Sequence, residues 1–209
     1  MNGWPIVAWA TLAVATIVAA IFAVEGTDAD GLGMAIRATA RTSVVFFTLA
    51  FAASALRRRW PNAATSWLLR NRRQLGVSYA SSHFIHLLLI LTVAGWTVHG
   101  FVTVRPMVTI VGGGIAYVFL ALMTLTSFDT TAAWLGPRRW RQLHVTGGYY
   151  NWFIFAQSFF RMVTKSAVYW PFAALVAGSM ALRWLPVREA REFSSRADVH
   201  RSTGRAASV

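Results

Sequence analysis

Long apolar runs separated by short polar segments dominate the chain. The first run, Pro5 to Val24, contains no charged side chain. It has about 20 residues, the length that a helix needs to cross ~30 Å of hydrocarbon at ~1.5 Å per residue. Five further apolar runs follow. The pattern predicts an all-α integral membrane protein, a six-helix bundle with spans at 5–24, 34–56, 76–98, 107–126, 144–160 and 168–182.

The polar segments between the runs differ sharply in charge. Segments 57–75 and 128–143, together with the tail from residue 183, hold 15 of the 20 basic residues. The first polar segment, 25–33, has acidic residues and no base. Basic residues collect on the cytoplasmic side of membrane proteins, so this distribution predicts that both termini are cytoplasmic.

Composition supports this interpretation. The chain is 56% hydrophobic and 13% charged, about half the charged fraction of an ordinary soluble domain. The net charge of +13 would fit a nucleic-acid binder, but basic residues beside membrane spans orient the protein and touch anionic lipid. We therefore expect membrane lipid, and no nucleic acid, as a partner. The bundle should occupy residues 1–186, followed by a basic, disordered cytoplasmic tail at 187–209.

Histidines are the main candidates for chemistry, because ionisable side chains at membrane depth are costly and usually functional. His83 and His86 lie three residues apart in the third run and should share one helix face. His99 lies at the outer end of that run, and His144 lies at the inner start of the fifth.

Two interpretations of these histidines remain open. A histidine can simply bond a carbonyl of a neighbouring helix, but two imidazoles on one face call for a stronger common reason. Imidazole binds haem iron, zinc and copper. The runs contain no Asp or Glu to complete a carboxylate-rich metal site, which favours haem. Glycines at 112–114 and 147–148 would let either a porphyrin or a helix backbone approach closely.

Four sequence pieces carry a family resemblance. They are Ala40-Arg41-Thr42; Arg72-Arg73-Gln74-Leu75-Gly76 with His86 ten residues on; Arg105-Pro106 with Thr109; and Leu125-Thr126-Ser127 with Leu135-Gly136, Arg139-Trp140 and Leu143-His144. In order and spacing they resemble the ferric-reductase-like transmembrane domain family. Within it, the chain is most similar to the haem-binding membrane subunits of periplasmic methionine-sulfoxide reductase systems. The resemblance covers roughly residues 35 to 165.

The resemblance implies a bundle that binds one or two b-type haems, with His86 and His144 as axial ligands. The family usually has a histidine 13 residues after the one at His144, and here that position is Gln157. Gln157 should face His86 at similar depth. Amide oxygen is a poor iron ligand beside imidazole, so that haem is five-coordinate, is bound by another residue such as His83 or His99, or is lost.

Arg72 and Arg73 are candidate partners for the propionates, or for another carboxylate ligand, beside an inner haem at His144. The alternative is that these arginines only set topology.

The resemblance implies the electron-transfer subunit of an oxidoreductase in the bacterial cytoplasmic (inner) membrane. Electrons would come from a separate flavin reductase with FMN, or from membrane quinol. They would pass to a soluble periplasmic oxidoreductase or to ferric iron. One alternative is a redox-inactive membrane anchor or assembly protein that has kept the bundle but lost a haem ligand. Another is a small transporter using His83 and His86, which the lack of an intramembrane carboxylate disfavours.

Overall fold

The computed structural model describes residues 3–104 and 106–186. Arg105 and the predicted tail at 187–209 lie outside the described residues. The described chain is helical apart from turns, which confirms the all-α class. The helices are α1 (Pro5–Glu25), α2 (Ala29–Arg59), α3 (Ala63–Arg70), α4 (Arg72–Val93), α5 (Val98–Val104), α6 (Met107–Leu125), α7 (Asp129–Leu135), α8 (Pro137–Val163), the 3-10 turn η1 (Ala167–Tyr169) and α9 (Trp170–Trp184).

Four helices, α1, α2, α4 and α6, are long and apolar enough to cross a membrane. They indicate a membrane protein, as the apolar runs predict. Helix α8 has 27 residues, or about 40 Å, but it is more polar. Helix α9 has 15 residues, or about 22 Å, which is shorter than the ~30 Å of a bilayer's hydrocarbon.

The outer surface of α6 is apolar, as expected for a helix that faces lipid. Its exposed apolar side chains recur every three or four residues, at Val108, Val111, Ile115, Val118 and Leu122. A helix of a soluble protein turns such a stripe inward. Here the stripe faces out, which matches a surrounding hydrocarbon phase in which helices satisfy their own backbone hydrogen bonds.

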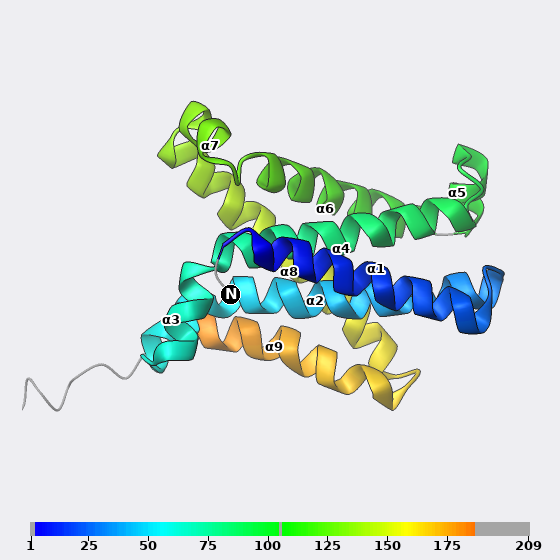
Figure 1. The fold of residues 1–209 in the computed structure, drawn as a ribbon, viewed down its shortest axis with the longest axis horizontal. Coiled ribbons are helices and arrows are strands. Elements are labelled where there is room, and N and C mark those ends of the chain that lie inside the picture. Colours follow the sequence, from blue (N-terminus) through cyan, green and yellow to red (C-terminus); the bar gives the residue numbers. More distant parts are fainter. Residues whose placement is uncertain (1–2, 105, 187–209) are drawn as a thin grey trace, which may run out of the picture.

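Helix α2 is the centre of the bundle, and it packs against α1, α4 and α9. Figure 1 shows these helices running along the long axis, with α6 beside α4 and α8 crossing obliquely behind from α7 to α9. Helix α8 packs against α6 on one side and α9 on the other. The interior is therefore enclosed mainly by α2, α4, α6 and α8.

The two arginine-rich segments lie at the same end of the bundle. Helices α3 and α7 are both found there, whereas α5 and the turn between α1 and α2 are at the opposite end (Figure 1). The start of the chain is tied to the arginine-rich end, because the Gly3 N–H donates to Asn71 Oδ1 over 2.9 Å. The two arginine-rich segments, which are far apart in the sequence, are thus gathered at one end of the bundle.

Aromatic rings from three helices meet in the core. Phe47 of α2 lies 5.3 Å from Tyr79 of α4 and 5.2 Å from Phe155 of α8, measured between ring centroids. The Tyr79 hydroxyl donates to Asn151 Oδ1 over 2.7 Å, which satisfies its buried polar end. These contacts connect α8 to α4 beside the histidines of α4.

Two predicted boundaries are wrong. The third run does not continue to residue 98 as one helix, because Gly95 and Trp96 adopt left-handed backbone angles, φ 62° and 57°. This turn ends α4 at Val93 and places His99 in the short α5. The helix predicted at 144–160 instead begins at Pro137. Proline suits the first helical turn, where its missing N–H costs nothing.

Candidate functional site

The hydrogen bonds of His86 define which nitrogen of its ring carries the proton. His86 Nδ1 lies 3.1 Å from Thr39 Oγ1 and 3.1 Å from the carbonyl oxygen of Ile36, both on α2. The Thr39 hydroxyl also lies 2.8 Å from the Ala35 carbonyl oxygen. Since a carbonyl oxygen can only accept, the Ile36 contact places a proton on Nδ1.

This arrangement suits a metal-ligating histidine. Such a histidine usually donates its other ring N–H to a carbonyl or carboxylate, which fixes the tautomer and the direction of the ring. The same bond to Ile36 is also what a purely structural intramembrane histidine would make. The contact of His86 therefore fits both interpretations that the sequence leaves open.

His83 lies beside His86 in a column of stacked rings. The His83 and His86 centroids are 5.1 Å apart with an interplanar angle of 11°, and Tyr117 of α6 stacks on His83 at 4.9 Å. The Tyr117 hydroxyl donates to the His83 carbonyl over 3.0 Å. His83 Nδ1 is buried without a hydrogen-bond partner. Rings stacked in parallel point past one another, so His83 in this position cannot be the opposite axial ligand of an iron held by His86.

A cluster of hydroxyl groups lies next to Thr39, which contacts His86. This cluster was not predicted from the sequence. Ser82 Oγ lies 2.9 Å from both Ser43 Oγ and Thr42 Oγ1, and it also contacts the Thr39 carbonyl. The signal was present as spacing, since Ser82 precedes His86 by four residues and Thr39 precedes Ser43 by four. Such a spacing places each pair on one helix face.

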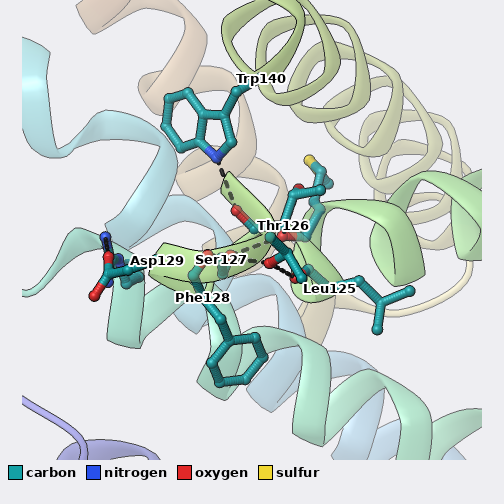
Figure 2. A network of polar contacts seen from close by, with 9 residues as sticks. Leu125, Thr126, Ser127, Phe128, Asp129 and Trp140 are labelled. Atoms are coloured by element: carbon teal, nitrogen blue, oxygen red, sulfur yellow. Dashed lines mark hydrogen bonds and ion pairs between the residues drawn. The ribbon is translucent and has the colours of Figure 1, made fainter. Parts of the chain in front are cut away.

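His144 lies in a second polar network at the arginine-rich end. Its Nε2 is 3.1 Å from Thr126 Oγ1, and its ring stacks on Trp140 with centroids 4.1 Å apart. Figure 2 shows the Trp140 indole N–H donating to the Thr126 carbonyl, over 2.8 Å. The Thr126 hydroxyl also lies 2.7 Å from the Leu122 carbonyl oxygen. The contact with Thr126 occupies Nε2 of His144, and Nδ1 is the other nitrogen of the ring.

The two histidines named as ligands lie at different levels of the bundle. Phe155 of α8 touches His83, with ring centroids 5.4 Å apart. His144 precedes Phe155 by 11 residues, about 16 Å along α8. The structure therefore does not bring His86 and His144 to one iron, and it is compatible with two separate sites.

Gln157 does not face His86. It lies two residues after Phe155, so it is at the expected depth on α8. Two residues are a rotation of about 200° around a helix, and Gln157 is exposed. The expectation that its side chain would take the place of a ligand opposite His86 is therefore corrected. His99, the other proposed substitute, is exposed on α5.

The arginines of the α4 start have contacts within the chain. Arg73 pairs with Asp129 at 2.7 Å, in a largely exposed ion pair. Figure 2 shows Asp129 close to Thr126 and Ser127. Arg72 donates from Nε to the Ala50 carbonyl over 3.0 Å. Among the described residues, Arg73 thus contacts a carboxylate and Arg72 does not.

The glycines that were considered for a flat ligand divide into two groups. A Cβ on Gly147 would lie 2.9 Å from Met123 Sδ and 3.2 Å from a ring carbon of Phe119, so this glycine serves the packing of α8 against α6. Cβ atoms on Gly113 and Gly114 would meet nothing within 4 Å. Close helix packing is therefore the role of Gly147.

Within residues 3–104 and 106–186, no group of three His, Asp or Glu side chains could by itself hold a metal ion. The imidazoles of α4 and α8 are thus the groups with metal-binding chemistry, and a porphyrin would have to supply the other iron ligands. No protein-family model matches the chain, and neither a curated protein nor a solved structure matches it significantly.

Proposed function

We propose that this protein is a haem b-binding electron-transfer subunit of a bacterial cytoplasmic membrane. The observation that carries the proposal is the His86 side chain. Its Nδ1 lies 3.1 Å from the Ile36 carbonyl and from Thr39 Oγ1, both on α2, and contacts of this kind orient a ligating imidazole inside a helical bundle. The resemblance to the ferric-reductase-like family supports the same cofactor.

In this proposal, haem b supplies reversible one-electron chemistry when bound. His86 binds the iron, and Thr39 and the Ile36 carbonyl orient its ring. Phe155 and Tyr79 exclude water from this level of the bundle. His144 is the candidate ligand of a second, inner haem, and its ring must then present Nδ1 or turn away from Thr126.

The proposal includes an electron donor and an electron acceptor that are separate from this chain. Donors are a separate cytoplasmic flavin reductase, with FMN, or membrane quinol, and the acceptor is a soluble periplasmic oxidoreductase or ferric iron. A second candidate function is a redox-inactive anchor or assembly protein. It is favoured by the exposure of Gln157, because the side chain at this position of α8 does not face His86.

A spectrum of purified protein separates these two functions. Protein prepared in detergent with haem available during expression should show the reduced-minus-oxidised bands of a b-type cytochrome. Extraction should recover about one or two haems per chain. Protein that remains colourless after reconstitution with haem would support the anchor function.

We further propose that α8 and α9 also cross the membrane, giving six spans with cytoplasmic termini. The chain has no cysteine, so single cysteines can be labelled without background. Ser166→Cys, between α8 and η1, should react with an impermeant maleimide in cells whose outer membrane alone is permeable. Arg138→Cys, at the start of α8, should react only after the cytoplasmic membrane is opened. Equal labelling of both from outside would show that α8 does not cross.

A further inference from the structure

Two arginines from different helices converge on one turn of α2 at the arginine-rich end. Arg72 is the first residue of α4, and Arg183 lies in the last turn of α9. Arg72 Nε donates to the Ala50 carbonyl over 3.0 Å, and Arg183 Nη1 donates to the Phe51 carbonyl over 3.0 Å. Two like charges are thus held at successive carbonyls of one helix.

Both guanidinium groups are fixed by further contacts. The Arg183 guanidinium carbon lies 4.4 Å from the centroid of the Phe51 ring and 5.1 Å from that of Tyr149, and its Nε donates to the Tyr149 hydroxyl over 3.3 Å. Arg72 Nη1 lies 3.5 Å from Ser54 Oγ. Arg72 is exposed and Arg183 is half-buried, and these contacts hold both guanidinium groups against the bundle.

Among the described residues, no acidic side chain balances the positive charges of Arg72 and Arg183. In this part of the chain, neither arginine forms an ion pair, and the ion pair found at this end joins Arg73 to Asp129. Both guanidinium groups are positive and are held at successive carbonyls of α2, so their charges repel each other. Holding two cations together without an anion costs free energy unless a negative group binds between them.

The unused donors match a phosphate group. A guanidinium has five N–H groups, and Arg72 and Arg183 each use two within the chain. Ser54 accepts an N–H of Arg72, and Tyr149 accepts from Arg183 and also interacts with the Trp184 side chain. A hydroxyl oxygen that accepts can still donate its own O–H. Paired guanidinium groups with hydroxyl donors are well suited to the oxygens of a phosphate.

We propose that Arg72 and Arg183, with Ser54 and Tyr149, form a binding site for the headgroup phosphate of an anionic phospholipid. The level of the site favours a lipid over a soluble phosphate. Arg72 begins a helix that is apolar enough to span the membrane, so its guanidinium lies where headgroups are found. The inner leaflet is the anionic one and attracts basic residues at this level. The site does not depend on haem.

Native mass spectrometry of the full chain, purified in detergent as expressed, tests the site by titration with phosphatidylglycerol or phosphatidylcholine and also reports bound haem. We expect wild type to prefer phosphatidylglycerol. The affinity of the double variant Arg72→Gln/Arg183→Gln for phosphatidylglycerol should be lower by about tenfold or more, since charge-assisted hydrogen bonds are lost. The matched control is Arg138→Gln/Arg141→Gln, which removes the same charge from exposed positions at this end and should leave the affinity unchanged.

Equal weakening in both double variants, or equal binding of the two lipids by wild type, would overturn the proposal. If the double variant does not fold, Tyr149→Phe is the substitute test, because it keeps both charges. Tyr149→Phe should weaken phosphatidylglycerol binding by a smaller factor than the double variant is expected to. Unchanged binding in Tyr149→Phe would also overturn the proposal. Titration with inorganic phosphate distinguishes the source, because phosphate binding without phosphatidylglycerol binding would exclude the lipid. Loss of haem alone in the arginine variant, with lipid binding intact, would assign these arginines to propionates instead.

Discussion

Replacing His86 with alanine is expected to remove the haem at the level of α4 and α2. Alanine offers no nitrogen to iron, and the described part of the chain has no second imidazole facing this position, since His83 is stacked in parallel. Haem per chain, measured after extraction, should fall to near zero if there is one site and by about half if there are two. The b-type absorption bands should fall in proportion.

His99→Ala is the matched control for this result. It removes an imidazole from the same segment of sequence, but His99 is exposed on α5, so haem content should not change. His86→Gly adds a second test, because imidazole supplied in solution can enter the space of the lost side chain and restore the bands. Unaltered haem content in His86→Ala would contradict ligation by His86.

Replacing Gly31 with alanine is expected to destabilise the bundle strongly. A Cβ at this position would lie 2.0 Å from the carbonyl oxygen of Gly26, a backbone atom that cannot move aside as a side chain can. Gly26 itself is held at φ 80° in the turn between α1 and α2. Relieving the overlap must shift that turn or the first turn of α2, at a cost of about 2–3 kcal/mol.

For a chain of this size, such a cost corresponds to a fall of roughly 5–10 °C in the midpoint of thermal unfolding. The midpoint can be measured in detergent for Gly31→Ala beside Gly113→Ala. Gly113 is the control, because its Cβ would meet nothing within 4 Å and alanine is the better helix former. Equal midpoints for the two variants would show that the turn accommodates the extra methyl group.

Much of the architecture was predictable because lipid imposes a simple requirement on sequence. A helix must present about 20 apolar residues to cross, and this length is visible without knowledge of any contact. The runs beginning at Pro5 and Met107 became helices with almost the expected bounds. The runs rich in polar residues were less well defined, and α8 begins seven residues before the predicted span.

The candidate site was predictable in its residue types but not in its geometry. The rarity of histidine inside a membrane identified His86, and spacing placed His83 on the same face. The rotation of α8 relative to α4 is decided by packing of large rings such as Phe155, and this rotation turns Gln157 away. Phe155 and Gln157 are two residues apart and lie on opposite faces of α8. The sequence alone does not show which of these faces packs against α4.

The sequence by itself determined that the protein is a helical membrane protein with basic residues gathered between particular spans, because hydrophobic length and charge are properties of local segments. Only the tertiary structure decided which groups meet: Ile36 and Thr39 at His86, Thr126 at His144, and the two arginines Arg72 and Arg183 on one turn of α2. Those contacts join residues 18 to 132 positions apart. They depend on how helices rotate and cross, which is set by side-chain packing over the whole bundle.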